Sequence, residues 1–363
     1  MTYSMKIGIV AFNRSWRFMN GGVTCADVYK QILTHNEFDA DIIAVNFSSC
    51  PFDFPGYDKK YDLNEHEWDE ALKQYDRLVI LNYASLGREP SSRWYTNRLL
   101  KVIDSRDSTS YVFVLPDEFS CTGIVISDLI KHGIRDRWMF NSEEVQHYIG
   151  SGLGIRGAWF NHITPRKLNV PLEDKKRGIH YVGRLNEEQK FILTLLTVCS
   201  SLNIDLELYG PVYKPLFDTI AKLPQPLHLF WEKSYKGRCE EPIPAMAIRR
   251  PFRFSWGVVR GYKEGLQRFT GFTGDFMPRI EQSVTESIRT GSVPILVCST
   301  IPEWFPHEYA ITLDSYDVPS MTEQLESKLV YNASTVERLN ECNKLLDKRM
   351  ELSMENLRRM LNL

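Results

Sequence analysis

Two glutamates lie on a helical stretch that runs directly into an apolar strand. Residues 278–296, PRIEQSVTESIRTGSVPIL, place Glu281 and Glu286 on the helix and a strand at 293–297, after a break at Gly291. Open parallel sheets bind ligands at the carboxyl ends of their strands, so such a helix can present carboxylates to a ligand. Five helical residues turn the chain by about 500°, which gives the two side chains separate roles. A solvated helix face is the alternative.

Two cations and a third carboxylate follow other predicted strands. Arg184 comes after Gly183 at the end of a strand, and Lys190 lies in the next helix. Fixed cations near a helix N-terminus stabilise the charge that develops on a departing diphosphate. Asp117 follows the strand 111–115 and is the candidate base for an acceptor hydroxyl, with helix capping as the alternative. Together these groups indicate a sugar-nucleotide site.

Glycines follow two further strands. Strand, glycine pair and helix is an arrangement that exposes backbone N–H groups to an anion or a sugar. The stretch lacks a G-x-G-x-x-G motif, so a plain tight turn explains it equally well. The residues that we assign to the donor site on this basis are Gly22, Val23 and Thr24 after the first strand, and Tyr209 and Gly210 after the strand 205–209.

A basic stretch interleaved with aromatic residues lies before the acidic helix. Residues 233–268 hold nine Lys or Arg against three Glu. Such side chains neutralise DNA phosphates, and aromatic rings can hold a base that is flipped out of the stack. A solvated basic loop with core aromatics is the alternative. The predicted DNA contacts are Arg249, Arg250, Arg253 and Arg260 in this stretch, and Lys131 and Arg135 in the first half.

Composition restricts the class of protein. A chain of 363 residues predicts two domains, and a net charge of -2 requires any DNA contact to use a local basic patch. No apolar run approaches the ~18 residues of a membrane span. The start, MTYSMKIGIVAF, predicts a strand instead of a signal peptide. Seven scattered cysteines without a C-x-x-C indicate reduced thiols in the cytoplasm, and no spacing indicates a metal site.

Strands and helices alternate in both halves of the chain, which predicts α/β domains with parallel sheets. We expect domains at 1–165 and 178–340, a linker at 166–177, and a C-terminal helix, 341–363, that packs toward the first domain. The expected strands are 6–12, 41–45, 77–82, 111–115, 139–141, 178–182, 205–209, 227–231, 293–297 and 310–313. One expected helix follows the glycine pair and ends near residue 35. The other expected helices span 64–74, 91–104, 143–148 with Ser142 as N-cap, 187–201 and 335–363.

The segment IEQSVTESIRTGSVPIL resembles, without gaps, a segment of the phage DNA α-glucosyltransferases, which glucosylate 5-hydroxymethylcytosine. Weaker similarities follow the same order at Gly22-Val23-Thr24, at Asp117 in SYVFVLPD, and at Gly183-Arg184 with Lys190. Asp117 also resembles an aspartate of the phage β-glucosyltransferases. Ordinary retaining glycosyltransferases space their two glutamates eight apart, whereas the gap here is five, which leaves open whether the sugar configuration is retained or inverted.

The resemblance implies a GT-B fold, with two Rossmann-like doubly wound domains facing a cleft. It implies transfer of a sugar, glucose or a pentose such as arabinose, from a UDP-sugar to 5-hydroxymethylcytosine in double-stranded DNA. Arg184 and Lys190 would bind the diphosphate, Glu286 the ribose, and Glu281 the donor sugar, with Trp256 and Gly257 in the donor-site loop. A divalent cation is optional.

The same resemblance implies a monomer without membrane contact in the cytoplasm of an infected cell. Two alternatives stay open. One is a GT-B transferase with a glycan or lipid acceptor, which would carry a basic amphipathic helix in the first domain. The other is a binding module without catalysis, in which loss of Asp117, Arg184 or Glu286 would have no consequence.

Overall fold

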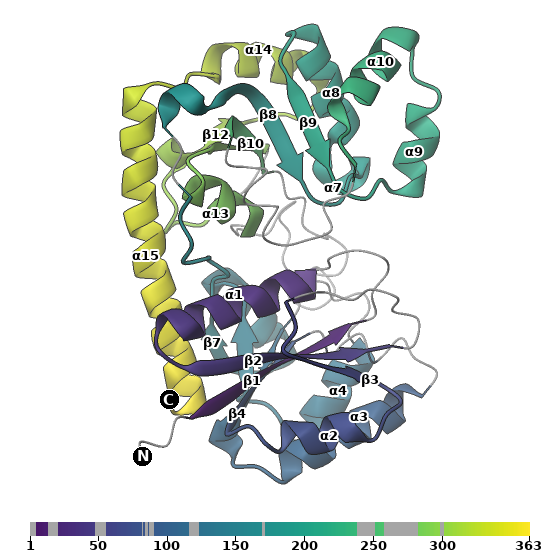
Figure 1. The fold of residues 1–363 in the computed structure, drawn as a ribbon, viewed down its shortest axis with the longest axis vertical. Helices are drawn as coiled ribbons and strands as arrows, with labels where there is room; N and C mark the ends of the chain where they lie inside the picture. The colour runs from purple at the N-terminus through teal and green to yellow at the C-terminus, as the bar shows by residue number, and fades with distance from the viewer. Residues whose placement is uncertain are drawn as a thin grey trace. The chain divides into compact units, whose positions relative to one another are not determined.

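The computed structural model describes residues 5–13, 21–47, 56–81, 83, 86, 91–115, 123–168, 171–237, 251–257, 282–297 and 301–363. The chain divides into two compact units. The described residues of unit 1 lie within Met1–Pro165 and Lys348–Leu363, and those of unit 2 within Arg166–Gly261 and Asp275–Asp347. Figure 1 labels the elements of both units.

Unit 1 is built on a seven-stranded parallel sheet in the order β3-β2-β1-β4-β5-β6-β7. A parallel sheet covered on both faces requires continuous apolar strands, and β1, KIGIVAFN, is buried along all but its first residue. The strand order reverses between β1 and β4, as in doubly wound nucleotide-binding folds. The strands are β1 Lys6–Asn13, β2 Asp39–Asn46, β3 Lys59–Asp62, β4 Arg77–Leu81, β5 Tyr111–Val114, β6 Trp138–Phe140 and β7 Gly157–Trp159.

Helices connect the strands of unit 1. Ser142 caps α5 as predicted, because its hydroxyl accepts a hydrogen bond of 3.2 Å from the Val145 N–H. The last part of α15, Ala333–Leu361, completes this unit: the Asn161 N–H donates to Ser353 Oγ at 3.0 Å. The other helical segments are α1 Gly21–His35, α2 Glu67–Leu72, α3 Ser92–Asp104, η2 Ser108–Ser110, α4 Gly123–Lys131, α5 Glu143–Val145, η4 Gln146–Gly150 and α6 Ser151–Leu153.

Unit 2 contains a five-stranded parallel sheet in the order β12-β11-β10-β8-β9. Tyr235 forms an isolated parallel bridge with Leu208 of β9, so the unit repeats the order of the first six strands of unit 1, with the third strand shortened to a bridge. The strands are β8 Lys176–Val182, β9 Leu206–Tyr209, β10 Phe252–Trp256, β11 Val293–Val297 and β12 Ile311–Leu313. The helices are η5 Leu172–Asp174, α7 Glu187–Lys190, α8 Ile192–Ser201, α9 Lys214–Ile220, α10 Gln225–Ser234, α13 Gln282–Arg289, η6 His307–Tyr309 and α14 Val318–Lys328.

The α/β fold class with two parallel sheets is confirmed, but two element predictions are wrong. The predicted strand 227–231 lies inside α10. Pro226 fits the first turn of a helix, and only Trp231 of the apolar run is buried while Leu229 is 56% exposed. The predicted single helix 187–201 is divided into α7 and α8 at Phe191, whose φ of 50° is left-handed.

Candidate functional site

The strand order of unit 2 reverses between β8 and β10, so the carboxyl ends of these strands define the candidate site. β8 ends at Val182 and continues into Gly183 and Arg184, while β10 ends at Trp256 and continues into Gly257. The two strands pair directly, with Phe254 opposite Ile179. Four of the predicted donor-site residues therefore come from adjacent strand ends.

A close approach of two backbones requires a glycine at position 210 of this edge. The Gly183 N–H donates to the Tyr209 carbonyl at 3.0 Å, and a Cβ on Gly210 would lie 1.8 Å from the Gly183 carbonyl oxygen. The turn after β8 is also held by the Tyr181 hydroxyl, which donates to the Arg184 carbonyl at 3.2 Å. These contacts fix the backbone of Arg184 and leave its side chain exposed, with Nη1 at 3.5 Å from the Tyr213 hydroxyl.

A buried indole joins Lys190 to the end of β10. Trp256 is 1% exposed, and its Nε1–H donates to the Lys190 carbonyl at 2.8 Å. Lys190 ends α7. Phe191 follows with a left-handed backbone conformation, which changes the direction of the chain before α8 begins. The contact thus locks the connection after β8 onto the neighbouring strand and holds the backbone of Lys190, whose side chain is buried, beside β10.

Glu187 is a residue of this junction that the sequence analysis missed. Its carboxylate accepts hydrogen bonds from the Leu193 N–H at 2.5 Å and from Thr194 Oγ1 at 2.9 Å, so it caps the first turn of α8. Burial raises the pKa of Glu187, although these bonds oppose the shift. The signal that could have found it is an acidic residue ahead of a helix start, but that signal needs the break at Phe191 to be known.

The acidic helix α13 packs at the same edge. A Cβ on Gly257 would lie 2.9 Å from Val284 Cγ2 on α13, so the absence of a side chain allows the helix to approach. Glu286 is half-buried on α13 and accepts a hydrogen bond of 2.8 Å from Gln282 Nε2. The predicted break at Gly291 is confirmed, with a φ of 72°. The structure therefore packs α13, the helix that carries Glu286, against the end of β10.

The side chains of Tyr209 and Arg253 form contacts other than those described above for the candidate site. The Tyr209 hydroxyl donates to Glu207 Oε2 at 2.6 Å, within its own strand. Arg253 lies on β10, where its Nε–H donates to the Lys175 carbonyl at 3.2 Å, and the guanidinium lies 5.7 Å from the Tyr331 ring centre. Its strand is the core aromatic strand of unit 2, since Phe252, Phe254 and Trp256 are all buried.

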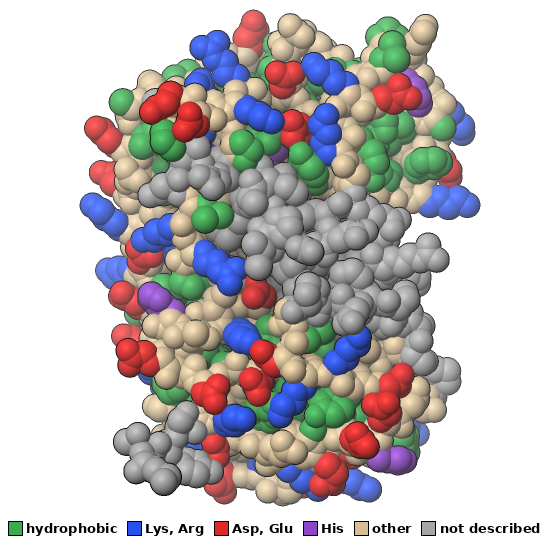
Figure 2. Space-filling model, viewed as in Figure 1, with side chains coloured by type: hydrophobic (Ala, Val, Ile, Leu, Met, Phe, Trp, Pro, Cys, Tyr) green, Lys and Arg blue, Asp and Glu red, His purple; other side chains and the backbone are tan. Residues whose placement is uncertain are grey.

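The remaining predictions lie in unit 1 or outside the described residues. Gly22, Val23 and Thr24 belong to the first turn of α1, so the glycine pair is part of the helix and does not precede it. Lys131 and Arg135 are exposed on the connection that enters β6, at the amino edge of the sheet. Figure 2 shows acidic and basic side chains interspersed on one face. The predictions outside the described residues are Asp117, Glu281, Arg249, Arg250 and Arg260.

Within the described ranges, no three His, Cys, Asp or Glu side chains form a group that could hold a metal ion. The search of those ranges for a helix with the length and hydropathy of a membrane span also found none. The candidate groups of unit 2 that the structure describes are Arg184, Lys190 and Glu286.

Known structures resemble the chain over its whole length. An α-glucosyltransferase in complex with UDP and a 13-mer DNA containing an HMU base has a TM-score of 0.67 at 12% identity, covering 99% of this chain and 100% of that one. The T4 phage β-glucosyltransferase in complex with UDP and Mn2+ has a TM-score of 0.56 at 12% identity, with 99% and 100% covered. This chain has the GT-B fold.

A third structure extends the GT-B comparison beyond phage enzymes. The Anabaena protein Alr3699/HepE in complex with UDP and glucose has a TM-score of 0.59 at 9% identity, covering 99% of this chain and 97% of that one. No protein-family model matches the sequence, and no curated protein matches it. At this level of identity the comparison establishes the GT-B fold, and the activity has to be argued from the site.

Proposed function

We propose that the protein is a glycosyltransferase that moves a sugar from a UDP-sugar to the hydroxymethyl group of 5-hydroxymethylcytosine in double-stranded DNA. The single observation that carries the proposal is the turn after β8 at the strand-order reversal of unit 2, where Arg184 follows Gly183 and the Gly183 and Gly210 backbones approach closely. The Lys190 backbone is bonded to Trp256 on the neighbouring strand. The solved relatives support it, because three of them bind UDP and one of these also binds HMU-containing DNA.

Catalysis of this reaction depends mainly on stabilising the negative charge that develops on the leaving UDP. The acceptor oxygen bonds to the anomeric carbon, the bond from that carbon to the diphosphate oxygen breaks, and UDP leaves with additional negative charge. Arg184 and Lys190 stabilise this charge more strongly in the transition state than in the ground state, which is the condition for catalysis. A divalent cation bound with UDP would add to this stabilisation. The transferred sugar is glucose or a pentose such as arabinose.

Carboxylates have the remaining roles. Glu286 accepts hydrogen bonds from the ribose hydroxyls, and Glu281 contacts the donor sugar. Asp117 takes the proton of the acceptor hydroxyl, a role that typically contributes about 10²–10⁴-fold in rate. Residues 1–165 bind the acceptor and residues 178–340 bind the donor, joined by the linker 166–177 and completed by the helix 341–363. The protein acts as a monomer in the cytoplasm of an infected cell, with its DNA contacts at Arg249, Arg250 and Arg260; Lys131 and Arg135 lie at the opposite edge of the sheet from the acceptor, and Arg253 bonds within unit 2.

A transfer assay tests the proposal. The protein is incubated with a panel of labelled UDP-sugars and with hydroxymethylated or unmodified duplex DNA. We expect label in hydroxymethylated DNA alone. Label in a lipid extract or glycan, with none in DNA, would contradict the acceptor and favour the second candidate, a GT-B transferase with a lipid or glycan acceptor. Failure to bind UDP would contradict the donor assignment.

Variants assign the roles. Arg184→Ala should raise the Kd for UDP and lower kcat together, whereas Lys222→Ala, which removes an exposed charge from the same unit, should change neither. Asp117→Asn should reduce transfer while UDP affinity stays unchanged, and Glu118→Gln is its matched control. Wild-type kinetics in Arg184→Ala would refute the diphosphate role.

A further inference from the structure

One buried polar atom of unit 1 lies where the strand order reverses. Asn13 ends β1, next to β4, and is 1% exposed. Its side-chain oxygen, Oδ1, receives no hydrogen bond from any residue that the structure describes. Buried polar atoms are nearly always paired, so one that is not requires an explanation. The carboxyl ends of parallel strands at such a reversal are where α/β sheets bind ligands.

The orientation of the Asn13 side chain is determined by its neighbours. Its Nδ2 donates to Asn46 Oδ1 at 3.2 Å and also to the hydroxyl of Tyr57. The Asn13 carbonyl accepts the Phe47 N–H at 2.9 Å, and Asn13 is opposite Asn46 in the parallel register. Both N–H groups of the Asn13 amide therefore donate hydrogen bonds, and Oδ1 is the atom of this side chain that still has an acceptor position to fill.

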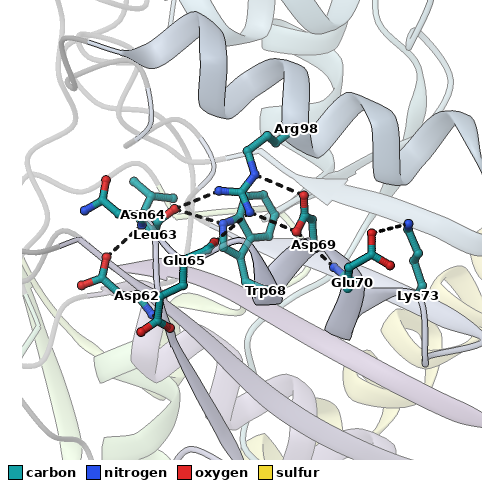
Figure 3. A network of polar contacts seen from close by, with 9 residues as sticks. All are labelled: Asp62, Leu63, Asn64, Glu65, Trp68, Asp69, Glu70, Lys73 and Arg98. Atoms are coloured by element: carbon teal, nitrogen blue, oxygen red, sulfur yellow. Dashed lines mark hydrogen bonds and ion pairs between the residues drawn. The ribbon is translucent and has the colours of Figure 1, made fainter.

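Buried Arg98 holds the adjacent strand ends in place, as Figure 3 shows. Its guanidinium donates to both Asp69 carboxylate oxygens at 3.1 and 3.0 Å, to the Leu63 carbonyl at 3.3 Å and to the Glu65 carbonyl at 2.8 Å. The Leu63 N–H in turn donates to the Asn46 carbonyl at 2.7 Å. The position of Asn46, and through it of Asn13, is thus preorganised by a network that begins at Arg98.

Other unpaired hydroxyls of unit 1 have different surroundings. Among the described residues, Tyr29 and Tyr83 also have buried hydroxyls without a partner. The Tyr29 ring stacks on Phe160 with centroids 4.1 Å apart, and the Tyr83 ring meets Phe113 edge-on at 5.1 Å. These two hydroxyls belong to aromatic side chains within the core, whereas Asn13 is an amide at a strand end.

The cluster of Asn13, Asn46 and Tyr57 is uncharged, which suits a neutral donor group better than a phosphate. We propose that Asn13 Oδ1 accepts a hydrogen bond from the exocyclic amine of the acceptor base, and that Asn46 and Tyr57 position it. This inference rests on the proposed function. Enzymes that modify a base read its flipped form through hydrogen bonds to its edge, and the cytosine N4 amine is a donor that uracil lacks.

The test compares two acceptors in duplexes of the same sequence, one with 5-hydroxymethylcytosine and one with 5-hydroxymethyluracil. Wild-type protein should prefer the cytosine by about tenfold in kcat/KM, the effect of one hydrogen bond to a buried group. Asn13→Leu should abolish this preference while the Kd for UDP stays within about twofold, since donor binding is assigned elsewhere. Loss of all transfer and UDP binding in the wild type would instead reject the proposed function.

Two further variants keep the inference falsifiable. Tyr57→Phe removes one of the groups that orient Asn13 and should reduce the preference by about threefold, even if Asn13→Leu does not fold. Tyr83→Phe removes an unpaired hydroxyl from the core of the same unit and should leave the preference unchanged. A preference that survives in folded Asn13→Leu, that is undiminished in Tyr57→Phe, or that falls equally in Tyr83→Phe, would overturn the assignment. Circular dichroism and thermal melting establish folding.

Discussion

Units 1 and 2 share a strand order but carry different chemistry where that order reverses. In unit 2, Arg184 follows β8 and Lys190 ends the next helix, α7, and the Gly183 and Gly210 backbones approach closely. In unit 1 the corresponding position carries Asn13 and Asn46, and the contacts are those of neutral amides. The strand order of the sheet therefore determines where a ligand binds. The residues that follow each strand determine whether that site suits an anion or a neutral group.

The units also differ in how each stabilises a buried arginine. In unit 1, Arg98 binds Asp69 and two backbone carbonyls, and it lies 4.6 and 4.9 Å from the Trp68 and Trp94 rings. In unit 2, Arg289 is fully buried, and burial lowers its pKa while Asp347, at 2.8 Å, opposes that change. Arg289 thus depends more heavily on a single carboxylate than Arg98 does.

The largest expected effect comes from the glycines of unit 2. Gly210 has a φ of 139°, and an added Cβ would lie 1.8 Å from the Gly183 carbonyl oxygen. Gly210→Ala should lower the free energy of unfolding by about 4 kcal/mol and weaken UDP binding by more than about tenfold. Urea denaturation and calorimetry measure these two quantities.

Gly237→Ala is the matched control for that change. Gly237 has a φ of 92° but nothing within 4 Å of an added Cβ, so only backbone strain of about 1 kcal/mol is expected. Equal losses in the two variants would mean that strain, and not the approach to Gly183, explains the glycine at position 210.

The buried arginines allow a direct comparison of the two units. Asp347→Asn should cost about 3 kcal/mol in the free energy of unfolding, because it removes the carboxylate that lies 2.8 Å from the buried Arg289 guanidinium. Asp69→Asn should cost about 2 kcal/mol, since the Leu63 and Glu65 carbonyls and two indole rings still stabilise Arg98. Chemical denaturation of both variants gives the two costs. The reverse order would show that Arg289 does not depend on its carboxylate in the way described.

Substitution of two tryptophans distinguishes an effect on stability from an effect on UDP binding. Trp256→Phe removes the bond to the Lys190 carbonyl, and Trp138→Phe removes a bond of 3.1 Å to the Ile134 carbonyl in unit 1. Each should cost about 1 kcal/mol of stability. Only Trp256→Phe should also weaken UDP binding, because Trp256 bonds to the Lys190 backbone whereas Trp138 lies in unit 1. Weakened UDP binding in Trp138→Phe would show that any loss of core packing affects the donor site.

The smallest expected effect is a dependence on pH. Burial raises the pKa of Glu187, so its stabilising contribution is complete below its ordinary pKa and is lost as pH rises through the raised value. Glu187→Gln should therefore gain stability relative to wild type between acidic and neutral pH, measured by denaturation across that range. Asp69 behaves in the opposite sense: burial acts to raise its pKa, but the hydrogen bond and charge of Arg98 outweigh it, and the pKa is lowered. A relative loss in Glu187→Gln would contradict the raised pKa.

Local patterns predicted the elements with clear signals. The passage from α13 through Gly291 into β11 was predictable because a glycine in left-handed geometry ends the helix and an apolar run follows. β10 was missed because Arg253 stands among its aromatics, so the stretch suggested a basic surface. α10 was mistaken for a strand because a five-residue apolar run fits either structure. Hydrophobic periodicity alone does not distinguish a strand from a helix in so short a run.

The candidate site was predictable only in part. The strand end before Gly183 and Arg184 was predictable, whereas Lys190 ends α7 instead of lying inside the single longer helix that was predicted. The role of Glu187 was not predictable, because it depends on the left-handed turn at Phe191, and a phenylalanine gives no local sign of that conformation. The free oxygen of Asn13 was not predictable either, since it follows from the register of β1 on β2 and from the distant Arg98 network.

The indole of Trp256 is a fluorophore in a dry environment, one hydrogen bond away from the backbone of the lysine assigned to phosphate binding. Its emission responds to the field of charges nearby. Titration with nucleotide can therefore be followed optically and without a label, and a version of the chain that retains Trp256 as its single tryptophan would report donor occupancy in real time.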